Sequence, residues 1–247
     1  MRLMNHFKLN LGFSLVEMAV VLVILGFILS SLLLPFATQV DLSKYVENRK
    51  AMNDVKEAII GFGISNGYLP CPAISVLNGA EDRNIATGVC NGGKRNGFVP
   101  WATLGLPKLD AWGHIYEYSV TPAYANSLTK IGLTTTTDIT IKTRINGGGL
   151  TNLSNANAVP MVIFTHGKNG ILGYADDGTQ IANTSTTNFD EATNAATISN
   201  ATASSSTFIS RDFASQATAA GGEYDDVVVW LSPSQYINRL VMAGQLP

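Results

Sequence analysis

The sequence predicts an α+β fold in which a long N-terminal helix, transmembrane in its first half and amphipathic in its second, packs on an antiparallel sheet. Three observations predict it. No residue from Met18 to Val40 is charged, and a bilayer core needs roughly 20 apolar residues at helical rise. Apolar residues then recur at helical spacing as far as Phe62. Beyond residue 110, short β-type runs alternate with turn residues.

The first twelve residues form a short basic leader. They contain Arg2 and Lys8 and no acidic residue, and the first acid beyond the uncharged run is Asp41. Basic residues on the N-terminal side place that end in the cytoplasm and direct the rest outward. We therefore expect a leader at 1–12 and a transmembrane helix at 13–36.

Glu17 helps to distinguish the possible roles of the N-terminal apolar run. No A-x-A-like cleavage site follows the apolar run, which argues against an ordinary secretory signal. A plain signal anchor remains an alternative, but it does not explain an ionisable side chain near the start of the run. A carboxylate at membrane depth costs about 2.5–3.5 kcal/mol, so such a residue indicates a function.

Residues 12–17, GFSLVE, resemble the class III prepilin signature of type IV pilins and type II secretion pseudopilins. The resemblance implies that a prepilin peptidase cleaves between Gly12 and Phe13 and that Phe13 is then N-methylated. It also implies a pilin-like fold, and it makes Glu17 the acid that guides subunit docking. Pro35 lies one position later than the helix-kinking proline of many pilins, which leaves only the position of the kink open.

The function implied by the resemblance is that of a structural subunit, a minor pilin or pseudopilin. Its partners would be the prepilin peptidase, other pilin or pseudopilin subunits, an inner-membrane assembly platform and, before assembly, membrane lipid. The location would be the bacterial inner membrane, single-pass, with the N-terminus cytoplasmic and the C-terminal domain periplasmic, and then the filament. The alternative is a tip-located adhesin or a minor pilin that binds DNA or another ligand.

The amphipathic stem is expected at 37–66. Glycines at 61 and 63 and the Asn66-Gly67 pair should end it. The apolar stripe should pack on a sheet, and its members are Leu42, Tyr45, Val46, Met52, Val55, Ile59, Ile60 and Phe62.

An exported globular domain is expected at 67–247. We predict strands at 113–121, 138–145, 157–166 and 224–232, and a helix at 232–244 that begins with a serine cap and a proline. Residues 175–222 are dominated by Thr, Ala, Asn and Ser, which predicts a long loop.

Cys71 and Cys90 are the two cysteines of the chain. An even count in an exported domain favours a disulfide, which would close a loop of about twenty residues and add roughly 3 kcal/mol. Two free thiols and a metal site are the alternatives, although no CxxC motif supports a metal.

Composition and motifs argue against other functions. Only 14% of residues are charged and the formal net charge is −2, which does not suit a nucleic-acid partner. The segment from Gly88 to Lys94 has P-loop spacing, but Arg95 stands where Ser or Thr should bind magnesium. The chain has three histidines and no HExxH or GxSxG motif. We therefore expect no enzyme activity and no required cofactor.

Acidic residues flank the long loop and suggest calcium, which takes six to eight oxygen ligands. The segment before 227–230 resembles the calcium loop near the C-terminus of the major pseudopilin of type II secretion, and Asp110–Gly113 resembles the D-x-W-G turn of that family. Solvated loop acids are the alternative. Further acids lie at Asp190, Glu191 and Glu223, and the ligands that we predict are Asp176, Asp177, Asp225 and Asp226.

Overall fold

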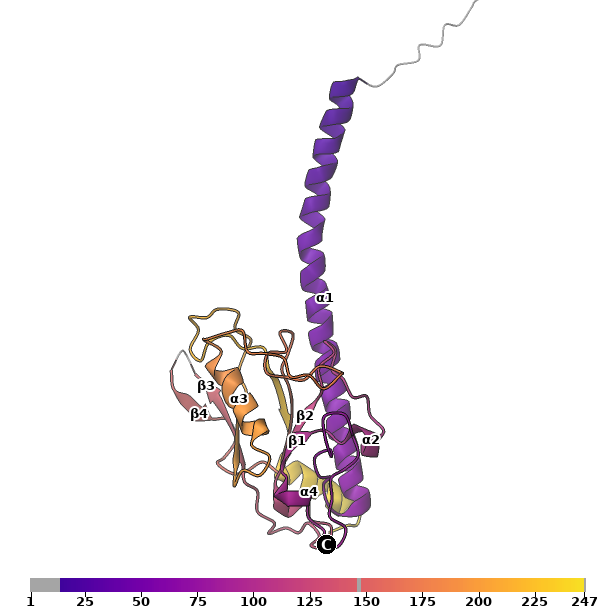
Figure 1. The fold of residues 1–247 in the computed structure, drawn as a ribbon, viewed down its shortest axis with the longest axis vertical. Coiled ribbons are helices and arrows are strands. Elements are labelled where there is room, and N and C mark those ends of the chain that lie inside the picture. The colour runs from indigo at the N-terminus through magenta and orange to yellow at the C-terminus, as the bar shows by residue number, and fades with distance from the viewer. Residues whose placement is uncertain (1–13, 146–147, 247) are drawn as a thin grey trace, which may run out of the picture. The chain divides into compact units, whose positions relative to one another are not determined.

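The computed structural model describes residues 14–145 and 148–246, with the backbone alone for 31–38. The chain divides into two compact units, Met1–Tyr45 and Val46–Pro247. Helix α1 (Leu15–Asn66) is 52 residues long and belongs to both (Figure 1). The leader 1–12, Gly12 and Phe13 lie outside the described residues.

The first unit overturns the transmembrane part of the predicted fold class. Across residues 14–145 and 148–246, no helix combines the length and the apolar character that a membrane crossing requires. The predicted transmembrane helix at 13–36 and the single-pass inner-membrane location are therefore wrong, and α1 begins at Leu15.

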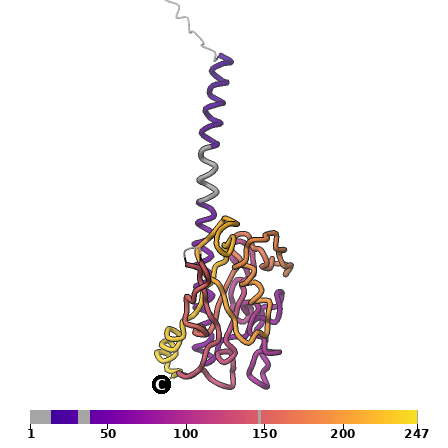
Figure 2. The backbone as a smooth tube through the Cα atoms, turned by 90° about the vertical axis from the view of Figure 1, so that its left-hand side faces the viewer, coloured from indigo at the N-terminus to yellow at the C-terminus, as the bar shows by residue number. Residues whose placement is uncertain are grey.

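In the second unit, one face of α1 enters the core. Met52, Val55, Ile59 and Ile60, all members of the predicted stripe, are almost fully buried. They pack with side chains of the larger sheet and of α4 (Pro233–Met242), which lies at one edge of the unit (Figure 2). An ion pair between Glu57 and Arg239 also joins α1 to α4. The stripe is therefore real in the last turns of the helix.

The larger sheet has four antiparallel strands in the order β1-β2-β5-β7. Its strands are β1 (Asn96–Phe98), β2 (Glu117–Val120), β5 (Met161–Thr165) and β7 (Val227–Trp230). Three of them confirm predicted strands. Every residue of β5 is buried, as its continuous apolar run requires.

A second sheet of three strands, in the order β4-β3-β6, departs from the prediction. Its strands are β3 (Ile139–Arg144), β4 (Leu150–Asn152) and β6 (Ser206–Ile209). β3 pairs antiparallel with β4 but parallel with β6. The predicted α+β class with an antiparallel sheet is confirmed by the larger sheet, and the parallel β3–β6 pair is an addition that the sequence did not predict.

The predicted loop at 175–222 contains two regular elements, α3 (Phe189–Ser199) and β6. Asn194 of α3 explains how a polar segment is held in place. Its side chain donates to the Ile209 carbonyl (3.0 Å) and accepts from the Ile209 amide (2.7 Å), completing the free edge of β6. Ile198 of α3 joins a second core with Phe164 and Phe208.

Short elements complete the fold. They are a four-residue helix, α2 (Trp101–Leu104), and two 3-10 turns, η1 (Asn91–Gly93) and η2 (Pro122–Tyr124).

Candidate functional site

Glu17 lies in the first turn of α1 and is exposed. The Ser14 amide donates to Glu17 Oε2 (2.8 Å), and the Glu17 amide donates to Ser14 Oγ (3.2 Å). The backbone hydrogen bond from Ser14 lowers the pKa of the Glu17 carboxyl. This reciprocal pair is a capping box, which satisfies two amides at the start of a helix. Glu17 therefore has a local structural role.

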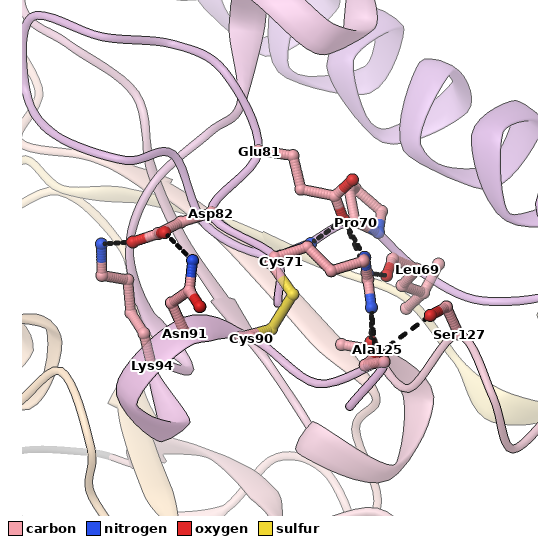
Figure 3. Close-up of a disulfide and its surroundings, with 12 residues drawn as sticks. Leu69, Pro70, Cys71, Glu81, Asp82, Cys90, Asn91, Lys94, Ala125 and Ser127 are labelled. Carbon is pink, nitrogen blue, oxygen red and sulfur yellow. Dashed lines mark hydrogen bonds and ion pairs between the residues drawn. A yellow bond between two sulfur atoms is a disulfide. The ribbon is translucent and has the colours of Figure 1, made fainter. Parts of the chain in front are cut away.

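The predicted disulfide between Cys71 and Cys90 is confirmed. Both residues are buried, and their Cα atoms are 5.5 Å apart. Figure 3 shows Asp82, Asn91 and Lys94 together on one side of the bond. Asp82 accepts from Asn91 Nδ2 (2.7 Å) and from Lys94 Nζ (2.6 Å). The lysine of the P-loop-like spacing thus serves an ion pair within the domain.

Arg83 connects the disulfide loop to its surroundings. It donates to Glu81 Oε1 (2.9 and 2.6 Å) and to the Gly88, Ala125 and Leu69 carbonyls. The Glu81 carboxylate in turn accepts from the Cys71 amide (2.8 Å). The segment between the two cysteines is therefore held by charge as well as by the covalent bond.

An acidic cluster is formed by Glu191, Asp225 and Asp226, whose carboxylate oxygens lie within 4.8 Å of one another. Glu191 comes from the first turn of α3, and the two aspartates immediately precede β7. The Asp225 amide donates to Glu191 Oε1 (2.8 Å). The backbone fold thus brings together acids from two separate elements.

Hydrogen bonds orient each carboxylate of the acidic cluster. Asn188 Nδ2 donates to Glu191 Oε2 (3.1 Å), and the Asn169 amide donates to Asp225 Oδ2 (2.8 Å). Asn194 Nδ2 donates to Asp226 Oδ2 (2.8 Å). Asp225 Oδ1 and Asp226 Oδ1, both buried, have no hydrogen-bond partner among the described residues.

The remaining predicted calcium ligands lie elsewhere. Asp176 is exposed and pairs with Lys108 Nζ (2.9 Å). Asp177 is also exposed, and its Oδ1 accepts from the Thr179 amide (2.9 Å). Neither belongs to the acidic cluster that the described residues form. The structure therefore groups Asp225 and Asp226 with Glu191, which the predicted ligand set omitted.

A buried histidine borders the acidic cluster. His166 Nε2 lies 3.1 Å from Glu117 Oε2, and His166 Nδ1 lies 3.8 Å from Asp226 Oδ1. Burial alone would lower the pKa of His166, but the carboxylates of Glu117, Asp226 and Glu191 raise it to about 9. Burial raises the pKa of Glu117 despite this partner.

Sequence reasoning missed this assembly of Glu117, His166 and Glu191. β2, β5 and β7 are neighbours in the sheet, and Glu117, His166 and Asp226 lie on or next to them. Adjacent acids at 190–191 and 225–226 were visible signals. Their proximity depends on α3, which the composition of the segment did not reveal.

Asp110 organises the turn before β2. Its Oδ1 accepts from the Trp112 amide (2.9 Å) and the His114 amide (2.8 Å), and its Oδ2 accepts from Thr165 Oγ1 (2.5 Å). One buried carboxylate thus joins the 110–113 turn to the end of β5.

No family model matches this chain, and the searches of characterised proteins and of solved structures found no significant similarity either. Membership of the pilin family and a pilin-like fold therefore stay predictions that rest on residues 12–17. Function has to be argued from side chains.

Proposed function

We propose that the protein is a structural subunit of a helical filament, a minor pilin or pseudopilin, and that it assembles through the first part of α1. The observation that carries the proposal is the exposure of this segment. Large apolar side chains cover all sides of the helix, and each is between 46% and 87% exposed: Leu15, Val16, Met18, Val20, Val21, Leu22, Val23, Ile24, Leu25, Phe27 and Leu29.

Such a helix needs partners. A helix that is apolar on every side is typical of a buried position, because no orientation on a surface hides all of its faces. A contiguous exposed apolar surface of this size marks an interaction site. Copies of the same helix, packed around one another, would bury every face at once. Repeated head-to-tail contacts that do not close into a ring generate a helical filament.

Glu17 would set the position of each copy along the filament. Cleavage after Gly12 would leave a free α-amino group on Phe13, four residues before Glu17 in the sequence. In the apolar filament core, this cation from one copy would pair with the Glu17 carboxylate of a neighbour, because an unpaired buried charge is costly. The prepilin peptidase, an assembly platform and other subunits are the partners in this proposal, and it involves no catalysis.

The test is co-expression of the full chain with a prepilin peptidase. Mass spectrometry should show loss of residues 1–12, and electron microscopy and sedimentation should show filaments. Gly12→Val should abolish cleavage. Glu17→Gln should be cleaved normally and assemble poorly, whereas Glu47→Gln, at an exposed acid further along α1, should do both normally.

Two results would contradict the proposal. A chain that is cleaved but stays monomeric would contradict the proposed role as a filament subunit. Normal filaments from Glu17→Gln would show that the charge pair does not determine register, although apolar packing between helices could still drive assembly.

A further inference from the structure

A small pocket lies beside β1, an edge strand of the larger sheet. Its volume is about 180 Å³, and its walls come from the segment 73–75, from β1 and from the end of α3. Glu117 of β2 and Tyr174 also line it. The residues of the acidic cluster are not among its lining residues, so the pocket is a different place in the fold.

Glu117 supplies a carboxylate to this pocket. The residue is only 1% exposed, and its Oε2 lies 3.1 Å from His166 Nε2. No described residue donates a hydrogen bond to its other oxygen, Oε1, although the residue lines the pocket. Buried polar atoms are normally satisfied by a hydrogen-bond partner, and a carboxylate oxygen without one is costly. Oε1 is therefore available to a donor that enters the pocket.

Two other polar side chains of the pocket already have partners within the protein. Asn96 donates from Nδ2 to the carbonyls of Thr197 (2.9 Å) and Asn200 (2.8 Å), and its Oδ1 accepts from two serine hydroxyls. Lys94 Nζ pairs with Asp82 (2.6 Å). Neither side chain is therefore free to compensate the buried carboxylate.

Aromatic rings form part of the pocket wall. Phe98 and Tyr174 are both half-buried and pack edge to face, with ring centroids 5.0 Å apart. Burial and then the Glu117 carboxylate raise the pKa of Tyr174, so the negative charge acts on its hydroxyl. Aromatic faces attract cations as carboxylates do. The two kinds of group in one pocket therefore suit the same class of ligand.

The side chains behind the pocket also favour a cation. His166, the partner of Glu117, has a second carboxylate, that of Asp226, 3.8 Å from its Nδ1. One imidazole thus faces two carboxylates and cannot neutralise both. Burial raises the pKa of Glu117 despite its histidine partner, as expected for a carboxyl with too little positive charge around it.

We propose that this pocket binds a primary ammonium group on a short unbranched carbon chain, with Glu117 Oε1 as its acceptor. The rings of Phe98 and Tyr174 and the side chains of Ile74 and Ile198 would contact the ligand. Pockets for drug-sized ligands have volumes of about 300–1,000 Å³. This smaller pocket suits a chain about as long as that of lysine.

Saturation-transfer NMR of the full chain with n-butylammonium chloride tests the proposal. The method observes the ligand, so it does not depend on whether the chain forms filaments. We expect saturable binding of n-butylammonium. Binding of 1-butanol, an uncharged molecule of the same size, should be weaker by about tenfold or more, because hydrogen bonds to charged groups are the stronger ones.

Nα-acetyl-lysine N-methylamide distinguishes two sources of the ammonium group. If this blocked lysine binds as n-butylammonium does, the ligand is a lysine side chain of a polypeptide. If n-butylammonium binds and the blocked lysine does not, the ligand is a free amine. Both results support the proposal.

Variants of the pocket locate the binding. Glu117→Gln keeps the shape of the side chain and removes its charge, so it should weaken n-butylammonium binding by about tenfold or more. Tyr174→Leu removes a half-buried ring and should weaken binding by about threefold, the size expected of a cation–π contact. Asp177→Asn removes one charge from an exposed position outside the pocket and should bind normally.

The unmodified chain and Tyr174→Leu decide the matter if Glu117→Gln does not fold. Absence of saturable n-butylammonium binding would overturn the proposal. So would equal affinities for n-butylammonium and 1-butanol, because the pocket would then select a carbon chain and not a charge. Unchanged binding in a folded Glu117→Gln or in Tyr174→Leu would also overturn it.

Discussion

Ser14 and Glu17 exchange two hydrogen bonds at the start of α1, each side chain accepting from the backbone amide of the other. The S-x-x-E spacing ahead of an apolar run is a known signature of a capping box. The position of the carboxylate therefore has a local reason as well as the proposed intersubunit one. Replacing Glu17 by Ala would remove both roles together.

Ser14→Ala should loosen the first turn of α1, because it removes the acceptor for the Glu17 amide. The expected loss is about 1 kcal/mol, confined to that turn. Hydrogen exchange of the first-turn amides measures it directly. Glu17→Gln should retain protection, since glutamine also closes a capping box. Equal loss of protection in both variants would show that the carboxylate charge of Glu17 contributes as much to the turn as the Ser14 hydroxyl does.

Replacing Cys71 and Cys90 together by serine should lower the free energy of unfolding by about 3 kcal/mol, as expected for a loop of this length. The effect arises because the unfolded chain regains freedom between the two positions. Urea denaturation of the double variant and of the oxidised parent gives the difference. The ion pairs around Arg83 should keep the loop in place. A change well under about 1 kcal/mol would mean that these contacts alone determine loop stability.

Asp138→Asn should destabilise the domain by about 3 kcal/mol, because it leaves a buried guanidinium without its counter-charge. Arg95 is 1% exposed and donates to both Asp138 oxygens at 2.6 Å. Asp82→Asn is the comparison, since Asp82 and Lys94 both reach solvent and such pairs contribute about 0–1 kcal/mol. Chemical denaturation of both variants should separate them. Equal losses of stability in Asp138→Asn and Asp82→Asn would show that the burial of Arg95 does not increase the cost of breaking its ion pair.

Asp110 should make the domain sensitive to acid. Burial opposes its ionisation, but the hydrogen bonds from His114 and Thr165 outweigh this and lower its pKa. A carboxyl with a lowered pKa in the folded state contributes stability above its unfolded pKa of about 3.9, and the contribution disappears as pH falls through the folded value. In Asp110→Asn, the loss of stability below about pH 4 should therefore be shallower.

Urea midpoints measured from pH 7 down to pH 3 test this prediction. Asp176→Asn, at an exposed acid, should keep the slope of the parent protein. If the urea midpoint falls with the same slope at acid pH in Asp110→Asn and in the parent protein, carboxyls other than Asp110 determine the stability in acid.

The sequence predicted those parts of the fold that depend on local pattern. The strands at Glu117–Val120, Met161–Thr165 and Val227–Trp230 lie in continuous β-type runs, and each prediction was confirmed. The transmembrane interpretation was wrong, since no helix among the described residues is long and apolar enough to cross a membrane. α3 was missed because Thr, Asn and Ser dominate its surroundings, and its position depends on Asn194 binding the edge of a distant strand.

The candidate sites show the same difference between features that depend on local sequence and features that depend on distant elements. The disulfide could be predicted because the chain has two cysteines and one pairing. The partner of Asp225 could not, because Glu191 reaches it through a helix that local composition did not indicate. A pair of neighbouring acids in a sequence does not reveal which other elements will fold against it.

The parallel pairing of β3 with β6 has a consequence for the order of folding. Ile139 is opposite Ser206, so the chain must close a long loop, through β5 and α3, before this ladder forms. Such non-local pairing slows folding, because loop-closure entropy is spent before the contacts compensate it. Within the smaller sheet the β3–β4 pair is close in sequence, so β6 should be the last strand to join it. During that interval β3 would present an open edge to other chains.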